Sequence, residues 1–238
     1  MYQGYCWVCQ KHVLLEFDRK FGSAENVNWR ERLVCSGCHL NCRLRLALHV
    51  IEGRLGMPKS ARVYLTEHLT PLARAMKTRG WAPTTSEFLP DVRRGTVDTR
   101  GIRCEDLTQL TFGDASFDAV LCFDVLEHIP NHRHALRELR RVIVPGGCAV
   151  MTFPFVATAD ANIVRAELRP DGSINHLLPA EFHGDPLDAS KGILCFHHFG
   201  WQVLEEARAA GFKDVAAHLF WSSDYAYIGP EQIIFVAS

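Results

Sequence analysis

The sequence predicts an α/β protein built on a mostly parallel sheet, with a small metal-binding module ahead of it. The apolar run Phe117–Phe123 is typical of a strand that is covered on both faces. Apolar residues then recur at helical spacing from 135 to 142, and a Pro-Gly-Gly turn ends this helix before another apolar strand, 148–153. Two Cys-x-x-Cys pairs near the N-terminus predict the separate module.

Residues 1–56 are expected to form a zinc-binding module and a linking helix. Each Cys-x-x-Cys turn aims two thiolates at one ion, and two such turns complete a tetrahedral sulfur site. The segment between the turns has few branched aliphatic residues, so the ion would supply much of its folding free energy. The predicted ligands are Cys6, Cys9, Cys35 and Cys38.

Two other groups match part of this cysteine pattern. Cys35, Cys38 and His39 fit covalent haem attachment, and Cys42 would complete an iron–sulfur set with the same two cysteines. Zinc is favoured because a second Cys-x-x-Cys pair is present and the N-terminus lacks an export signal.

After the second pair, apolar residues between 40 and 51 lie on one helical stripe, and Arg43, Arg45 and Arg54 lie off it. We expect these arginines to form a solvated helix face, with contacts to an anionic substrate as the alternative. Glycines and a proline between 53 and 58 end the helix, which places the main domain at 57–238.

The main domain is expected to begin with a strand at 62–67. Thr70 followed by Pro71 is a strong helix start, because the threonine hydroxyl caps the helix and the proline occupies its first turn. A short apolar stretch at 86–89 would be the second strand. A later helix, 201–210, precedes two final strands at 215–221 and 232–237.

The region from Glu105 to Gly147 resembles the second half of the class I S-adenosylmethionine-dependent methyltransferases, especially their small-molecule branch. The shared features are an acidic-Leu pair, F-x-D-x-S-F-D, L-E-H after a strand, R-E, R-V and P-G-G. The resemblance implies a Rossmann-like sheet of seven strands with the last one antiparallel. It also implies S-adenosylmethionine as the cofactor.

The loop after the first strand differs from the pattern of this family. The family has a glycine-rich loop here, whereas Glu67, Leu69 and Pro71 stand at the positions where glycines are expected. Either an altered loop holds the cofactor, or the site no longer binds it. Glu67 is included among the candidate cofactor residues, and Thr70 with the amides at the helix start would receive the carboxylate of the cofactor.

Acidic residues at the ends of successive strands complete the expected cofactor site. Glu87 follows Glu67 by 20 residues, the spacing at which a carboxylate accepts the ribose hydroxyls. The resemblance implies that Asp106 accepts the adenine amino group and that the Leu107 amide reads the ring. Asp106 could instead cap a turn. Asp124, at the end of the 117–123 strand, would orient the ammonium of the donor or the acceptor.

Histidines are the expected catalytic bases, because methyl transfer to a hydroxyl or an amine releases a proton near neutral pH. His128 follows a strand whose end faces the ligand edge of the sheet. His183 and His197 lie in a polar segment, about 156–199, that is too long for a plain connector and is expected to act as a substrate lid.

The favoured function is methyl transfer to an oxygen or nitrogen of a polar small molecule or sugar. The formal net charge of −1 gives no general attraction to nucleic acid, and no apolar run long enough to span a membrane is present. Nine cysteines without an export signal indicate the cytoplasm. Two alternatives remain: a zinc-ribbon methyltransferase acting on ribosomal RNA bases, and a degenerate methyltransferase fold that serves as a binding module.

Overall fold

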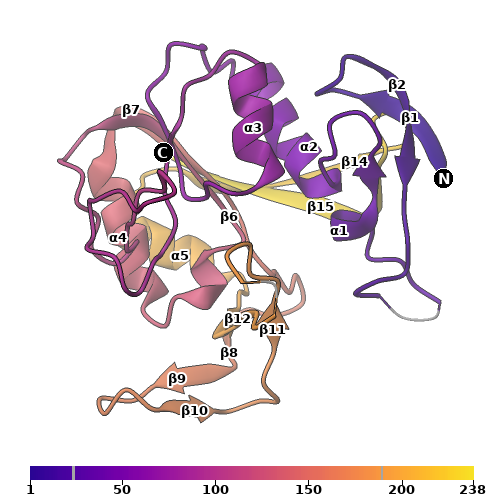
Figure 1. Ribbon diagram of the computed structural model, residues 1–238. Coiled ribbons are helices and arrows are strands. Elements are labelled where there is room, and N and C mark those ends of the chain that lie inside the picture. The colour runs from indigo at the N-terminus through magenta and orange to yellow at the C-terminus, as the bar shows by residue number, and fades with distance from the viewer. Residues whose placement is uncertain (23–24, 189) are drawn as a thin grey trace. The chain divides into compact units, whose positions relative to one another are not determined.

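The computed structural model describes residues 1–22, 25–188 and 190–238 (Figure 1). Within these ranges no helix has the length and apolarity needed to cross a membrane. The helices and strands, in chain order, are β1 (Tyr2–Cys6), β2 (Lys11–Glu16), α1 (Trp29–Arg32), β3 (Val34–Cys35), α2 (Cys42–His49), a π-helical turn η1 (Val50–Arg54), β4 (Val63–Leu65), α3 (Pro71–Thr78), β5 (Thr84–Thr85), β6 (Phe117–Phe123), a short helical turn η2 (Leu126–His128), α4 (His132–Val142), β7 (Ile143–Thr152), β8 (Ile163–Val164), β9 (Ala166–Leu168), β10 (Ile174–His176), β11 (Phe182–His183), β12 (Ile193–Leu194), β13 (His197–His198), α5 (Gln202–Ala209), β14 (Val215–Ser222) and β15 (Tyr227–Ala237).

Six of these strands form a central mixed sheet in the order β14-β15-β7-β6-β4-β5. Strands β5, β4, β6 and β7 are parallel to one another, and β15 pairs antiparallel with β7. Glu87, in the segment that follows β5, forms a parallel bridge with Cys104. This bridge adds a seventh strand position to the sheet, at Cys104. The predicted seven-stranded α/β fold with an antiparallel last strand is confirmed.

Strand β6 shows why a continuous apolar run predicts an inner strand. Every residue of β6 except Asp118 is buried, and the strand lies between β4 and β7. Both of its faces are therefore covered, as in parallel sheets generally. Helix α4 buries its apolar stripe, including Ala135 and Leu139, while its arginines stay at least partly exposed.

The Pro-Gly-Gly turn lies inside a strand, which corrects the expected strand start at 148. Helix α4 ends at Val142, and β7 begins directly at Ile143 with a register shift against β6. Gly146 has a φ of +81°, and a Cβ on Gly147 would lie 2.5 Å from the carbonyl oxygen of Asp118. Glycine is required here because this stretch of β7 approaches the backbone of β6 closely.

The second parallel strand is shorter and begins earlier than the expected 86–89. It comprises Thr84–Thr85, and pairing then continues only as the bridge at Glu87. The chain turns immediately afterwards, because the amide of Val92 donates to the carbonyl of Leu89 and the intervening Pro90 has no amide hydrogen to donate to a neighbouring strand.

The segment at 156–199 folds into short strand pairs. Strand β8 pairs with β13, β9 with β10, and β11 with β12, all antiparallel. A parallel bridge between Phe155 and Phe199 closes the two ends of the segment. In Figure 1 it is the orange part of the ribbon, with the β9–β10 hairpin at its tip. Its expected role as a lid stays a prediction.

Two compact units can be distinguished, and neither is continuous in the sequence. The first consists of Met1–Ala61, Pro71–Ala82 and Ala217–Ile234. The second consists of Arg62–Thr70, Pro83–Ala216 and Phe235–Ser238. The predicted boundary divides the sequence into two continuous parts, 1–56 and 57–238, whereas each compact unit consists of three separate segments.

Arg45, on the linking helix α2, does not lie on a solvated helix face, which corrects the expectation for this arginine. Arg45 is fully buried in the first unit. Its Nη1 and Nη2 atoms donate to the backbone carbonyls of Tyr225 and Ala226 at 2.9 and 3.0 Å. Two carbonyl oxygens from a turn that lies 180 residues away in the chain therefore accept hydrogen bonds from the Nη atoms of this buried cation.

Candidate active site and metal centre

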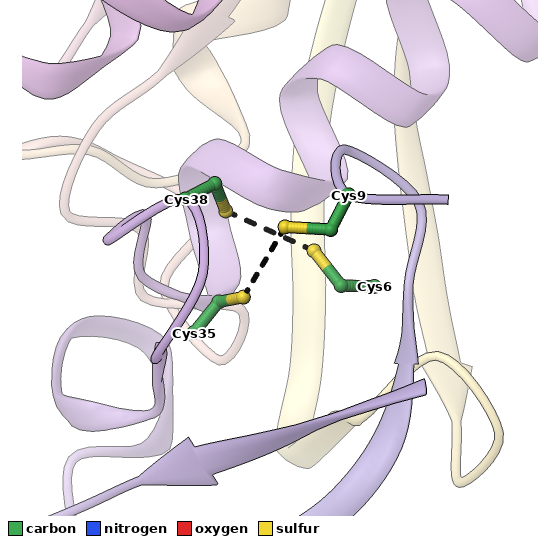
Figure 2. Close-up of side chains that lie close together, drawn as sticks. All are labelled: Cys6, Cys9, Cys35 and Cys38. Atoms are coloured by element: carbon green, nitrogen blue, oxygen red, sulfur yellow. Dashed lines mark hydrogen bonds between the residues drawn. The ribbon is translucent and has the colours of Figure 1, made fainter. Parts of the chain in front are cut away.

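The four predicted zinc ligands lie together in the first compact unit. Figure 2 shows their sulfur atoms pointing toward one another. The Sγ atoms are 3.8 Å apart for Cys6 and Cys38, and 3.7 Å apart for Cys9 and Cys35. A tetrahedron with zinc–sulfur bonds of ~2.3 Å has sulfur–sulfur edges of about 3.8 Å, so the spacing fits zinc. All four thiols are free of disulfide bonds.

Local backbone geometry explains how the second cysteine pair folds into a metal-binding turn. The amide of Gly37 donates to the Sγ atom of Cys35 at 3.3 Å. A Cβ on Gly37 would lie 2.9 Å from the Sγ atom of Cys9, which is too close for an ordinary contact. Burial raises the pKa of Cys9 to about 12. A cluster of thiolates here would therefore need a cation to be stable.

In the second unit, Glu87 holds the loop that follows β4. Its Oε1 atom accepts hydrogen bonds from the backbone amides of His68 at 2.7 Å and Leu69 at 3.0 Å. The Nδ1 atom of His68 also lies 2.8 Å from the hydroxyl oxygen of Thr85. A carboxylate from the next strand thus organises a loop that has no glycine. Its Oε2 atom makes no hydrogen bond to the described residues and remains available to a ligand.

Glu67 and Thr70 lie on the same loop. Glu67 is buried at the end of β4. The hydroxyl oxygen of Thr70, immediately before α3, is buried without a hydrogen-bond partner among the residues of the described ranges. An orphaned hydroxyl beside a helix start fits the carboxylate of an amino acid-like cofactor.

Asp106 and Leu107 follow the bridge strand at Cys104. The Oδ1 atom of Asp106 accepts from the amide and the hydroxyl of Thr108, at 2.8 and 2.7 Å. Asp106 therefore caps a turn, as the alternative interpretation held, and it does so with one oxygen. The Oδ2 atom of Asp106 stays available for the predicted contact to adenine. The side chain of the next residue, Leu107, is buried.

Asp124 lies where β6 ends. Its φ is +53°, a left-handed conformation that is uncommon for a residue other than glycine. Its amide donates to the carbonyl of Thr152 at 2.8 Å, and its Oδ1 atom accepts from the hydroxyl of Thr152 at the same distance. The last residue of β7 thus fixes the turn that leads into Leu126–His128.

Three side chains converge beyond this turn: Glu127, His128 and His183. The Oε1 atom of Glu127 lies 3.5 Å from Nδ1 of His183 and 3.7 Å from Nε2 of His128. Burial raises the pKa of Glu127. The neighbouring thiol of Cys195 and the carboxylate of Glu127 raise the pKa of His183 to about 11. Two of the three predicted bases therefore share one cluster.

The third predicted base, His197, lies apart from that cluster in its contacts. It is buried, its Nε2 atom lies 3.2 Å from the carbonyl oxygen of Pro130, and its ring packs edge-on against His132. Burial lowers the pKa of His197 to about 4. These contacts are those of a structural histidine.

Sequence reasoning missed Glu181 and Cys195, which lie close to His198 in the structure. Glu181 Oε1 lies 3.0 Å from Nε2 of both His183 and His198. One donor atom from each of Glu181, Cys195 and His198 lies within 4.8 Å of the others. A signal was available for Glu181, because it precedes His183 by two positions, and side chains two apart in extended backbone point to the same side.

Part of this chain is similar to a known family of domains. Residues 68–151 match a family model described as a methyltransferase domain. This region contains Thr70, Glu87, Asp106 and Asp124 and ends within β7. It covers the parallel part of the sheet that follows β4.

Two curated relatives match shorter regions. An uncharacterised protein of Methanocaldococcus jannaschii is 34% identical over 73 residues, which are 31% of this chain and 30% of that protein. A ubiquinone biosynthesis O-methyltransferase of Dechloromonas aromatica is 41% identical over 51 residues, which are 21% of either chain. The matches thus span less than a third of either curated relative.

Solved structures share the fold over a longer range. The glycopeptide N-methyltransferase MtfA complexed with sinefungin has a TM-score of 0.53 and 18% identity, over 82% of this chain and 92% of that one. The same protein complexed with S-adenosylmethionine has a TM-score of 0.50 and 17% identity, over 80% of this chain and 92% of that one. At this identity the likeness concerns the fold.

Proposed function

We propose that this chain, whose residues 68–151 match a methyltransferase-domain model, transfers a methyl group from S-adenosylmethionine to an oxygen or nitrogen of a polar small molecule or sugar. The observation that carries this proposal is the family match at 68–151. It coincides with a sheet in which acidic residues closely follow β4, β5 and β6.

The residues at the ends of these strands fit the cofactor. The unpartnered hydroxyl of Thr70 would receive the carboxylate of the methionine part. Glu87 and Asp106 each keep one carboxylate oxygen without a hydrogen bond to the described residues, and these oxygens would accept the ribose hydroxyls and the adenine amino group. Glu67 and Asp124 would lie near the ammonium. When bound, the cofactor supplies an electrophilic methyl group on a sulfonium.

The role of the protein in the transfer is to position the acceptor and to take up its proton. We assign this role to the cluster of Glu127 and His128, which follow β6, and His183, which lies on β11. The polar character of the cluster favours a hydrophilic acceptor. His197 remains the third candidate, although its contact with Pro130 points to a structural role.

We further propose that the four clustered cysteines of the first unit bind one zinc ion. The sulfur–sulfur spacing and the close approach at Gly37 support this. Nine free cysteines also favour a reducing compartment, and we propose the cytoplasm as the location.

Calorimetry with S-adenosylmethionine and a transfer assay with methyl-labelled cofactor test the proposed function. We expect saturable cofactor binding and label transfer to members of a panel of hydroxylated and amino-bearing small molecules, including sugars. Transfer to ribosomal RNA instead, with an affinity that falls steeply as salt rises, would favour the RNA alternative. Absence of cofactor binding by the folded protein would favour the degenerate binding module.

A further inference from the structure

Glu127 is a buried acidic residue whose burial lowers the stability of the fold unless its side chain has a partner. Its carboxylate is fully inaccessible to solvent, and neither oxygen has a hydrogen-bond partner within the described part of the chain. The nearest nitrogens, on His183 and His128, lie at 3.5 and 3.7 Å, beyond the usual hydrogen-bond length. Burying a carboxylate without hydrogen bonds is strongly unfavourable unless a cation compensates its charge.

Each of the two histidines turns one ring nitrogen toward this carboxylate. The Nδ1 atom of His128 lies 2.8 Å from the carbonyl oxygen of Leu194, which can only accept a proton, so Nδ1 carries the hydrogen and Nε2 faces Glu127. The Nε2 atom of His183 lies 3.0 Å from the carboxylate of Glu181, which leaves Nδ1 as the atom that faces Glu127. In each ring the outer nitrogen is engaged by an acceptor. This arrangement is typical of histidines that bind metal ions, because it fixes the tautomer and the ring orientation.

We propose that Glu127, His128 and His183 bind one divalent transition-metal ion, a site separate from the four cysteines. The three residues each place a donor atom within 4.8 Å of the other two. Bonds of ~2.0–2.2 Å to one ion require donor atoms about 3–3.5 Å apart, so small side-chain adjustments are enough. Two histidines and one carboxylate leave coordination positions open, as in catalytic zinc and iron sites.

Glu181 supports this site from outside and does not form it. Its carboxylate is already engaged by His183, by His198 and by Arg165, whose Nη2 atom lies 3.1 Å from Oε2. Its bond to His183 makes a carboxylate–histidine pair behind the proposed ion. Such partners usually contribute a factor of ~10–100 to metal affinity.

The chemical consequence rests on the proposed function. A divalent ion with open positions would bind a hydroxyl oxygen of the acceptor and lower the pKa of that hydroxyl, and the released proton would pass to solvent water. His128 and His183 would then be required for methyl transfer as metal ligands, in place of the role as bases. The acceptor class narrows to molecules that offer an oxygen donor to the ion.

Cobalt titration of the full chain tests the site, because Co²⁺ reports its ligands in the visible spectrum. The protein is used as purified, with the four-cysteine cluster holding its zinc. We expect one equivalent of Co²⁺ to bind with the weak visible bands of nitrogen and oxygen ligands, without intense thiolate charge-transfer bands. Glu127→Gln and His183→Ala should each weaken Co²⁺ binding at least ~100-fold, and Glu181→Gln ~10–100-fold.

Matched controls carry the same chemical changes at exposed positions. Glu205→Gln on α5 and His176→Ala on β10 should bind Co²⁺ like the wild type. Circular dichroism and S-adenosylmethionine calorimetry on every variant establish that it is folded. A wild-type protein that binds no Co²⁺, or a folded Glu127→Gln variant that binds it unchanged, overturns the proposal.

Binding that shows thiolate bands and disappears in Cys195→Ser also overturns it, because the ion would then lie on Glu181, Cys195 and His198. The proposed function fails independently, through absence of cofactor binding, whatever the result with Co²⁺. The two failures are therefore distinguishable.

Discussion

Glu87 shows how one side chain replaces a sequence motif. Glycines normally let a loop bring its amides close to a ligand, and this loop has none. Glu87 instead accepts the amides of His68 and Leu69, which fixes the loop from the neighbouring strand. The same carboxylate is expected to bind ribose with its other oxygen. The spacing of Glu87 in the sequence predicted the contact with ribose and gave no indication that this residue also fixes the loop.

Alanine at Glu87 or Asp106 should weaken S-adenosylmethionine binding by about 1–3 kcal/mol, the scale for losing a hydrogen bond to a charged acceptor. Glu87→Ala should also lower the free energy of unfolding, since two loop amides lose their acceptor. Calorimetry and urea unfolding measure the two effects. Glu205→Ala, at an exposed position, is the control. Wild-type cofactor affinity in both variants would show that the mapping of the cofactor is wrong.

Alanine at His128 or His183 should reduce single-turnover methyl transfer ~10²–10⁴-fold and leave S-adenosylmethionine affinity unchanged, because these residues serve the acceptor. His197→Ala should lower thermal stability more than the transfer rate, because its ring is buried against His132 and bonded to Pro130. Rapid-quench assays and thermal melts separate the two outcomes. Near wild-type transfer in all three variants would mean that positioning alone drives catalysis.

Gly37→Ala should impair zinc binding, because the added Cβ would lie 2.9 Å from the Sγ atom of Cys9. We expect a lower zinc content by elemental analysis and a lower melting temperature. Gly113→Ala is a matched control, since its Cβ would meet Ser116 at an ordinary 3.7 Å. Full zinc occupancy in Gly37→Ala would show that the turn relaxes freely.

At the scale of elements, helix α4 is tied to the loop that precedes β6. Glu138 on this helix accepts the amide of Leu110 at 2.9 Å and two hydrogen bonds from Arg141 at 2.7 Å. Arg141 in turn donates to the carbonyls of Phe112 and Leu110. One turn of the helix therefore anchors a loop that has little regular structure of its own.

This anchor should depend on pH. The guanidinium of Arg141 lowers the pKa of Glu138 below its usual value. A carboxyl group with a lowered pKa in the folded state adds stability above its unfolded pKa of ~4.3, and that contribution is lost as the pH falls through the folded value. Glu138→Gln should therefore cost about 1–2 kcal/mol at pH 7 and progressively less below about pH 4. Urea unfolding of both proteins across this range measures the difference, with Glu205→Gln as the control.

The short second strand is the element that sequence patterns describe least well. Its regular part is only Thr84–Thr85, and Glu87 pairs further on as a single bridge. Two residues carry no periodicity from which a strand can be recognised. Strand β6 was placed correctly because its seven residues form a nearly continuous apolar run that is long enough to recognise.

For the whole molecule, the sequence predicted the fold class, the antiparallel last strand and the four clustered cysteines. Each depends on patterns that are local in the chain. Arg45 could not be predicted, because its acceptor carbonyls at Tyr225 and Ala226 are 180 residues away or more. The partners of His183 were missed for a similar reason, since strand pairing within the 156–199 segment brings Cys195 toward it.

Removal of zinc should affect the first compact unit selectively. Chelation would remove the proposed ion, which would stabilise a small core, so amide hydrogen exchange should accelerate within Met1–Ala61. The part of Pro83–Ala216 that forms β6 and β7 should keep its protection. Mass spectrometry of peptides from chelated and zinc-loaded protein makes the comparison. Equal exchange in both states would mean that the four cysteines contribute no stability.

The dependence of Arg45 on Tyr225 and Ala226 has a consequence for the newly synthesised chain. Translation at ~5–20 residues per second separates these residues by roughly 10–40 s. Throughout that interval the cysteine pairs already exist, while the turn that accepts hydrogen bonds from the buried guanidinium does not. The first compact unit is thus completed only when its last segment, Ala217–Ile234, has been made, and its thiols wait on the ribosome until then. A nascent chain halted before Tyr225 would be a substrate for chaperones and oxidants in a way that the finished protein is not.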